Sequence, residues 1–158
     1  MVTQPKPIKA WIAVSSVLSP SKISSYALRI KLPNHKEPFL PSKAKPGVTA
    51  NHMYLQGTLD LASLLNCWKI PPDQPVLFYN PAEWQVWLLN TRNTGIADRE
   101  LYKQIYNELG DRAIECFYCP KESIPWLVKE RAKTRRLQHT LISRGPKWKQ
   151  FATPSIIT

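Results

Sequence analysis

The densest group of side chains with an evident chemical use is a basic run near the C-terminus. Residues 129–136 (KERAKTRR) contain five Lys or Arg residues and a single Glu. Such cations bind phosphates and release the counterions condensed around a nucleic-acid backbone. On a helix, Lys129, Lys133 and Arg136 share one face. A charge run is more often only a solvated face, but the density of this one favours a functional basic patch.

The basic run continues toward the C-terminus and there includes an aromatic residue. Trp148 lies between Lys147 and Lys149. An indole beside cations can stack on an unpaired base while the cations contact phosphates, as single-strand-binding proteins require. The residues predicted to bind nucleic acid are Lys129, Arg131, Lys133, Arg135, Arg136, Arg144, Lys147, Trp148 and Lys149.

The net charge of +11 is unevenly distributed along the chain. Residues 1–45 carry eight Lys or Arg against one acid, residues 46–120 carry five against eight, and residues 121–158 carry nine against two. Basic ends and a mildly acidic middle suit a phosphate backbone, with solubility or an acidic protein surface as alternatives. Lys22, Arg29 and Lys31, near the start of the chain, are candidates to extend the basic patch.

Cysteine and histidine supply the other reactive side chains. Cys116 and Cys119 have the C-x-x-C spacing of half a zinc site or a redox pair, but Cys67 and the three histidines are dispersed and offer no second pair of ligands. In a strand, the odd spacing would place the two thiols on opposite faces, which favours buried or edge thiols without a metal. His52 and His139 have no paired carboxylate in the sequence, so we expect surface or capping roles.

Apolar periodicity and breakers predict five strands. Ile8–Leu18 and Ser24–Leu32 read as a hairpin around a Ser-Pro-Ser turn, and Val76–Tyr79 is an apolar run typical of a central strand. Ala113–Tyr118 is a further strand. Phe39–Ala44 supplies a short one, which its neighbouring prolines confine to an edge.

Four helices are predicted between and after these strands. They are His52–Leu65, a helix that follows Asn80, a helix from Asp98 to Gly110, and one that opens at Ser123 and runs at least to Lys133. The second has Asn80 as its expected N-cap, with Pro81 at the first helical position and Glu83 three residues after the cap. The third repeats apolar residues every four positions and ends at a glycine.

This order of strands and helices resembles the ribonuclease H fold over residues 8–135. The most specific stretch is Val76–Leu89, an apolar strand that turns into a helix carrying aromatic and aliphatic residues. The resemblance implies an α/β architecture, with a mixed five-stranded sheet and flanking helices. We expect one ribonuclease H-like domain over residues 1–137 and a basic C-terminal extension over residues 138–158 that only a partner orders.

Active members of this family hold two Mg²⁺ ions about 4 Å apart between clustered carboxylates. The resemblance places these ligands on the first strand, the first helix, the end of the fourth strand and the last helix. There this chain carries Ala13-Val14-Ser15-Ser16, Gln56, Asn80, and Val128 or Lys129. Neutral amides and hydroxyls hold divalent cations too weakly against water, so we expect no bound metal, no cofactor and no nuclease activity.

A register shifted by one helical turn would bring Asp60, Glu83 and Glu130 into consideration as ligands. The first strand is unaffected by such a shift, because residues 1–36 contain no acidic residue. An active two-metal nuclease is therefore the least favoured of three hypotheses.

Length and composition bound the remaining possibilities. At 158 residues, with 43% hydrophobic residues and a mean hydropathy of −0.33, the chain can bury one core but has no apolar run that spans a membrane. The first nine residues contain no stretch of signal-peptide length, and three cysteines do not build a disulfide framework. We expect a cytoplasmic protein without a membrane partner.

The leading hypothesis is a non-catalytic ribonuclease H-like subunit that binds RNA or an RNA–DNA hybrid within a larger nucleoprotein assembly. By resemblance, the assembly is either viral or retroelement machinery or a prokaryotic RNA-guided antiviral defence complex with other protein subunits. The alternative is a protein-interaction adaptor that uses the basic ends of the chain and exposed aromatics among Trp11, Trp68 and Trp148.

Overall fold

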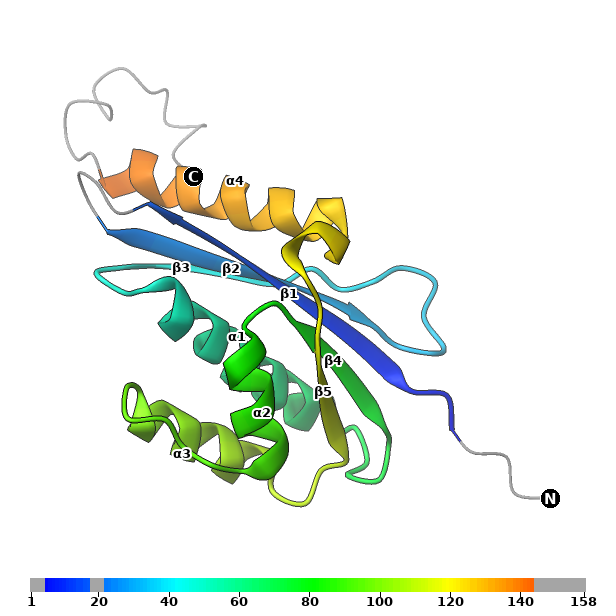
Figure 1. Ribbon diagram of the computed structural model, residues 1–158. Helices are drawn as coiled ribbons and strands as arrows, with labels where there is room; N and C mark the ends of the chain where they lie inside the picture. The colour runs from blue at the N-terminus through cyan, green and yellow to red at the C-terminus, as the bar shows by residue number, and fades with distance from the viewer. Residues whose placement is uncertain (1–4, 18–21, 144–158) are drawn as a thin grey trace.

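The computed structural model describes residues 5–17 and 22–143, with side chains as far as residue 140. Five strands form one mixed sheet in the order β3-β2-β1-β4-β5. Helices α1, α2 and α3 lie on one face of the sheet and α4 lies on the other (Figure 1). The strands are β1 (Ile8–Val17), β2 (Ile23–Lys31), β3 (Ser42–Pro46), β4 (Val76–Asn80) and β5 (Ile114–Tyr118).

The pairing confirms the predicted hairpin and the predicted α/β class. β1 runs antiparallel to β2, with Ala13 opposite Ala27, and parallel to β4, which in turn runs parallel to β5. β3 pairs antiparallel with the far side of β2 and forms one edge of the sheet. β1 therefore has hydrogen-bonded neighbours on both sides, as an apolar central strand requires.

The helices enclose two separate apolar clusters. They are α1 (Ala50–Cys67), α2 (Glu83–Thr91), α3 (Arg99–Leu109) and α4 (Trp126–Ser143), with a short 3₁₀ turn, η1 (Lys121–Ser123), before α4. The larger cluster lies between the sheet and α1–α3. The smaller one joins Ala13 and Ala27 to Val128 and Ala132 of α4, together with Ile124 and Cys119. Small side chains on both surfaces let α4 approach the sheet closely.

The third strand differs from the predicted Phe39–Ala44. It begins at Ser42, and Phe39 makes only an isolated bridge to Ile30. Pro38 and Pro41, on either side of this bridge, lack the N–H that a continuous ladder needs. The prolines therefore move the strand three residues toward the C-terminus.

The N-cap predicted at Asn80 is wrong. Asn80 is the last residue of β4, α2 begins at Glu83, and the cap position is Ala82, which makes no side-chain cap bond. Asn80 Oδ1 accepts a hydrogen bond from Ala82 N at 2.8 Å, so it stabilises the turn instead of the helix end.

Asp98 does occupy the N-cap position of α3, but in a left-handed conformation with a φ of 59° and without a side-chain cap bond. Its Oδ1 lies 3.0 Å from His52 Nδ1 on α1. The sequence shows no carboxylate paired with His52, because the one that it contacts in the fold is 46 residues away. The predicted end of this helix at Gly110, with a φ of 55°, is confirmed.

The last helix is longer than its predicted minimum. α4 continues past Lys133 and Leu137 to Ser143. Arg144, Lys147, Trp148 and Lys149 lie outside the described residues. Within the described part of the chain, no helix is long and apolar enough to cross a lipid bilayer.

The cysteines lie as their spacing predicts. Cys116 packs in the larger cluster and Cys119 in the smaller one, so the two thiols are on opposite sides of the sheet. Burial raises the pKa of the Cys116 thiol to about 12 and also raises that of Cys119. Both groups remain protonated near neutral pH, as structural thiols do.

Candidate nucleic-acid interface

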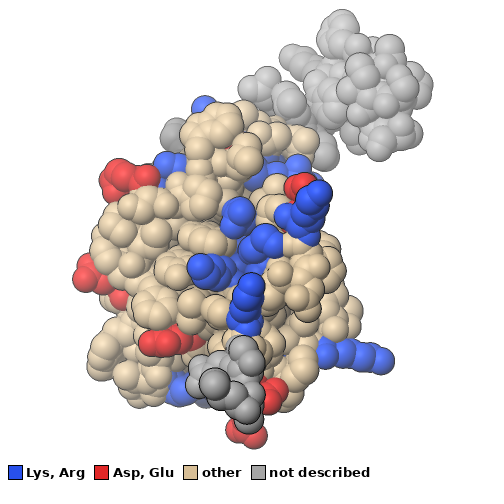
Figure 2. Space-filling view, turned by 90° about the vertical axis from the view of Figure 1, so that its right-hand side faces the viewer, with Lys and Arg blue, Asp and Glu red and all other residues tan. Residues whose placement is uncertain are grey.

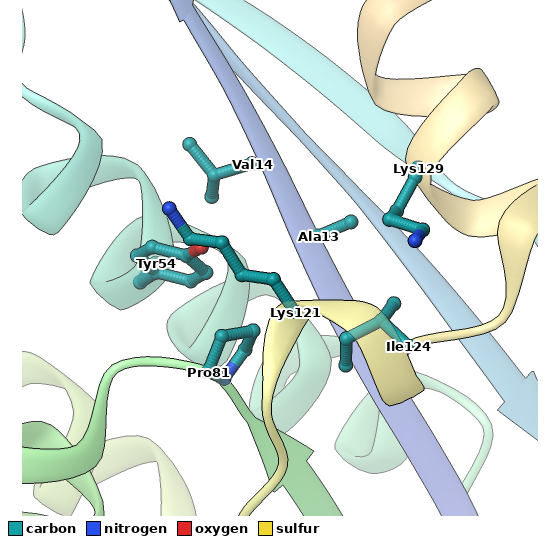
Figure 3. Close-up of a pocket in the computed structure, with 7 residues that line it drawn as sticks. All are labelled: Ala13, Val14, Tyr54, Pro81, Lys121, Ile124 and Lys129. Carbon is teal, nitrogen blue, oxygen red and sulfur yellow. The ribbon is translucent and has the colours of Figure 1, made fainter.

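A small cavity lies where the resemblance calls for metal-binding carboxylates. It opens between the C-terminal half of β1, the end of β4, α1, η1 and the start of α4 (Figure 3). Its volume is about 50 Å³, room for a few water molecules. The residues that line it are Ala13, Val14, Tyr54, Pro81, Lys121, Ile124 and Lys129.

The first strand supplies only neutral groups to this cavity. Ala13 and Val14 line it with methyl groups. Ser15, the next residue, accepts a hydrogen bond at its Oγ from Arg136 Nε of α4 at 2.9 Å. The strand position at which the resemblance calls for an aspartate is therefore apolar, and the hydroxyl of the adjoining Ser15 is engaged with a cation.

The first helix contributes Tyr54, two residues before the predicted Gln56. Gln56 instead contacts β3, where its Oε1 accepts from Lys45 Nζ at 3.0 Å, and its Nε2 donates to Asp60 at 3.0 Å. Asp60 also accepts from the Tyr26 hydroxyl on β2. Asp60 is thus held by residues of α1 and β2, away from the residues that line the cavity.

At the end of β4, the Asn80 side chain presents an N–H₂ group, whereas a cation would need an oxygen atom with a free lone pair. Asn80 is fully buried, and its Oδ1 is occupied by the backbone of Ala82. Its Nδ2 has no hydrogen-bond partner among the described residues. An amide N–H₂ cannot coordinate a cation, because it carries hydrogens and no free lone pair.

These side chains do not fit a pair of divalent cations. Mg²⁺ needs oxygen ligands with compensating negative charge. The cavity has no carboxylate in its lining and has two lysines. Over residues 5–17 and 22–140, no three His, Cys, Asp or Glu side chains lie close enough together to share a metal ion.

The cavity can instead donate hydrogen bonds to an anion. Figure 3 shows Lys121 extending toward Tyr54 and Val14, with Lys129 on the far side of Ala13. Burial raises the pKa of Tyr54 to about 12, so its hydroxyl keeps its proton near neutral pH. Two ammonium groups and a phenolic O–H are suited to phosphate oxygens.

The predicted basic residues of α4 flank its buried ridge. Val128 and Ala132 pack against the sheet. Lys129, which lines the cavity, and Arg136, which bonds Ser15, are half-buried and face β1. The structure therefore brings part of the predicted site together with the cavity.

The remaining described cations of α4, namely Arg131, Lys133 and Arg135, are exposed. The ion pairs found among the described residues join His52 to Asp98 and Lys103 to Glu100, so they involve none of these cations. None of these three cations is therefore held in an ion pair by a carboxylate of the described residues. The predicted contribution of Trp148 and its neighbours remains a prediction, because they lie outside the described residues.

Sequence reasoning missed Lys121 and Tyr54. Lys121 follows β5, which runs parallel to β4 and ends at the same edge of the sheet as Asn80. The sequence did contain a signal for Lys121. Parallel strands bring their carboxyl ends together, so a cation in the loop after a strand parallel to β4 is expected to lie near the end of β4. The sequence pattern placed Tyr54 on an apolar face of a helix, and nothing in it indicated a binding role.

Comparisons with known proteins identify the architecture. No protein-family model matches the chain, and no curated protein sequence does. Solved structures do match. LC11-RNase H1, isolated from compost and solved in complex with an RNA/DNA hybrid, has a TM-score of 0.72 at 12% identity and covers 84% of this chain and 99% of its own.

Two other structures match at similar coverage. RNase H1 from the archaeon Halobacterium salinarum has a TM-score of 0.64 at 8% identity over 84% of this chain and 96% of its own. A foamy viral protease–reverse transcriptase in complex with dsDNA has a TM-score of 0.67 at 16% identity over 83% and 94%. Together with the strand order β3-β2-β1-β4-β5, these matches show that the chain has the ribonuclease H-like fold.

Proposed function

We propose that this protein is a non-catalytic ribonuclease H-like domain that binds the phosphate backbone of nucleic acid. The observation that carries the proposal is the composition of the cavity, where Lys121, Lys129 and the Tyr54 hydroxyl occupy the region in which the family places carboxylates. Protein ammonium groups there supply the positive charge that metal ions supply in an active enzyme. They provide no means of activating water, because an ammonium group is not a base.

The helix extends this site along the backbone of the ligand. Lys129 belongs both to the cavity lining and to the basic run of α4, and Lys133 and Arg136 follow on the same flank. Successive phosphates can therefore contact the cavity and then the helix. Contacts to phosphates carry no sequence information, so we propose binding with low sequence specificity.

RNA or an RNA–DNA hybrid is the proposed ligand. The support comes from fold neighbours, since LC11-RNase H1 was solved with an RNA/DNA hybrid and the foamy viral enzyme with dsDNA. We also propose that the protein acts in the cytoplasm as a subunit of a nucleoprotein assembly, of either viral or retroelement type or RNA-guided defence type. The net charge of +11 suits a subunit that lies against nucleic acid.

The test measures binding of a labelled, blunt-ended RNA–DNA hybrid by fluorescence anisotropy over a series of salt concentrations. The double variant Lys121→Gln/Lys129→Gln should bind more weakly and lower the slope of log K against log salt by about 1.8, since each lost phosphate contact contributes about 0.9. Lys69→Gln/Lys103→Gln removes two exposed cations from the α1–α3 side of the sheet and should leave the slope unchanged.

Metal dependence separates this proposal from an active nuclease. Binding should be the same with EDTA as with Mg²⁺, and the hybrid should remain intact during prolonged incubation with Mg²⁺ or Mn²⁺. Hybrid cleavage that Asp60→Asn abolishes would overturn the proposal, as would an unchanged affinity of the cavity variant.

A protein-interaction adaptor remains the second candidate, favoured by aromatic exposure. Trp84, Trp87 and Trp126 expose 47%, 62% and 65% of their surface. The aromatics named from the sequence are less available, because Trp11 and Trp68 are half-buried. Partner binding through tryptophans would depend weakly on salt, whereas phosphate binding depends on it steeply.

A further inference from the structure

The face of the sheet on which α4 lies is only partly covered. α4 packs on β1, β2 and β3 at the level of Ala13 and Ala27. Two residues earlier along β1, and on the same face, Trp11 lies opposite Arg29 of β2. Trp11 also neighbours Tyr79 of β4, which neighbours Phe117 of β5. Four consecutive strands thus place one cation and three aromatic rings in a single row, all half-buried.

The rings of this row stack on one another. The Trp11 and Tyr79 ring centroids lie 5.2 Å apart with an interplanar angle of 18°, and those of Tyr79 and Phe117 lie 5.6 Å apart at 26°. The Arg29 guanidinium lies 4.9 Å from the centroid of the Trp11 ring. One end of the stack is closed by a cation. At the other end, on edge strand β5, the outer face of Phe117 has no ring or cation contact from a described residue.

The next row along the same face is basic. Lys9 of β1 lies directly opposite Lys31 of β2. Like charges at opposed positions of a sheet repel each other. The Lys31 ammonium donates hydrogen bonds to the backbone oxygens of Leu32, at 3.1 Å, and of His35, but neither ammonium takes part in an ion pair within the described residues. In the same row, Leu77 of β4 follows Lys9, and Glu115 of β5 follows Leu77. The Glu115 carboxylate is therefore two strands away from Lys9. Two neighbouring ammonium groups without a carboxylate partner favour the binding of an anion.

The charge distribution on the surface agrees with this placement. Figure 2 looks onto the side of the molecule from which the N-terminal segment leaves, and it shows Lys and Arg side chains gathered in a band with most Asp and Glu at its margins. Lys9 is the second residue of β1, which follows the N-terminal segment, and Lys31 is the last residue of β2. Phosphates would thus meet a concentrated positive potential here.

We infer that this partly covered sheet face, consisting of Arg29, Trp11, Tyr79, Phe117, Lys9 and Lys31, binds a single-stranded segment of nucleic acid. An unpaired base stacks on the free face of Phe117 and extends the existing stack, while the backbone contacts Lys9, Lys31 and Arg29. Interior bases of a duplex cannot supply that contact, because each is stacked on both faces, whereas the bases of a single strand are free to stack on the protein. Three strand spacings, about 14 Å in total, separate Arg29 from Phe117, which suits a short single strand.

This inference rests on the proposed function in taking nucleic acid as the ligand, but it assigns a different surface. The cavity adjoins Ala13, Val14 and the C-terminal ends of β4 and β5, whereas the aromatic row lies two residues nearer the N-terminal end of β1. A hybrid with a single-stranded overhang could occupy both. Each surface can be removed without changing the other.

The experiment compares two labelled probes, an unstructured twelve-nucleotide RNA and the blunt RNA–DNA hybrid. Phe117→Leu keeps an apolar side chain but removes the stacking ring, and it should weaken single-strand binding at least fivefold, since stacking one base contributes about 1–3 kcal/mol. Lys9→Gln/Lys31→Gln should lower the single-strand salt slope by about 1.4. Both variants should bind the blunt hybrid as the wild type does. Trp87→Leu, an exposed aromatic of α2 on the other face, is the matched control.

The possible outcomes each decide between the surfaces. If the wild-type protein binds the hybrid but not the single strand, this inference is overturned and the proposed function still stands. A loss of hybrid binding in the sheet-face variants equal to the loss of single-strand binding would show that no separate surface exists. Unchanged single-strand binding in both variants would also overturn the inference. The sheet face would then be assigned to the binding of a protein partner. Circular dichroism melts of each variant confirm that the fold is retained.

Discussion

At the scale of single residues, Gly57 shows how closely α1 approaches the sheet. A Cβ at this position would collide with Ile12 Cδ1 and lie 3.1 Å from Tyr26 Cδ1. Replacing glycine by alanine inside a helix otherwise gains about 1 kcal/mol of helix propensity. Overpacking a core costs about 1–3 kcal/mol, so we expect Gly57→Ala to lower the free energy of unfolding by roughly 1 kcal/mol in urea titrations.

A second substitution tests whether the collision is the cause. Ile12→Val removes the Cδ1 atom that a Cβ at position 57 would meet, and alone it should cost about 1 kcal/mol. The double variant should then be no less stable than Gly57→Ala, because the small cavity accommodates the added methyl group. Losses that simply add would show that the two side chains do not interact.

At the scale of secondary-structure elements, α2 protects the exposed edge of the sheet. Asn90 near the end of α2 donates from Nδ2 to Cys116 O and accepts at Oδ1 from Cys116 N, both at 2.8 Å. Its amide therefore acts as one residue of an additional strand beside β5. An open edge strand is a template for pairing with another chain, so this contact limits association.

Asn90→Leu should remove both hydrogen bonds and leave the backbone of Cys116 open at the edge. We expect a loss of about 1–2 kcal/mol in thermal unfolding, and self-association that increases with protein concentration in light scattering. Asn107→Leu, at an exposed position of α3, is the control and should stay monodisperse. Equal behaviour of the two variants would show that Asn90 does not protect the edge.

The elements themselves were largely predictable because their signals are local. The hairpin of β1 and β2, the apolar β4 and the α3 helix ending at Gly110 follow from side-chain alternation, apolar runs and a glycine stop. The start of α2 was not, because Asn80 bonds the next turn instead of the helix end. A capping motif in sequence cannot show which backbone N–H its side chain will reach.

The candidate site was predictable only in part, since a site combines residues distant in sequence. The absence of carboxylates at the first strand and at Asn80 can be read directly from the sequence, and so can the basic run of α4. The presence of Lys121 in the same cavity lining as Lys129 depends on the parallel pairing of β4 and β5. The row from Arg29 to Phe117 likewise depends on the register of four strands, which a sequence does not specify.

At the scale of the whole molecule, the sheet separates a polar side from a packed one. The α4 side carries the basic helix flank and the aromatic row, and the cavity opens at the edge of the sheet, where residues of both sides line it. The α1–α3 side holds the larger core, in which Tyr26, Tyr54 and Tyr102 are buried. Tyr54 belongs to both the cavity and the larger core, but the lysines of the cavity and the aromatic row lie outside that core. Variants of these residues can therefore be made without emptying the main core.

The tyrosines of the packed side make the whole fold sensitive to alkali. Burial raises the pKa of Tyr54 and Tyr106 to about 12, and it raises those of Tyr26 and Tyr102 further. The folded state holds these protons more tightly than the unfolded chain does. Their contribution to stability is complete below the ordinary tyrosine pKa of about 10 and is lost as the pH rises through the folded values. We therefore expect cooperative unfolding above about pH 10.

Tyr102→Phe isolates one tyrosine from this effect. The Tyr102 hydroxyl is buried and has no hydrogen-bond partner among the described residues, so its removal should leave stability at pH 7 unchanged or slightly higher. The variant should also unfold at a higher pH, because alkaline unfolding is no longer favoured by the ionisation of the Tyr102 phenol in the unfolded chain. Tyrosinate absorbance and circular dichroism, followed together during alkaline titration, measure both changes, and the comparison with wild type cancels the titration of the lysines. An identical alkaline midpoint in the two proteins would show that the Tyr102 phenol ionises without unfolding the core.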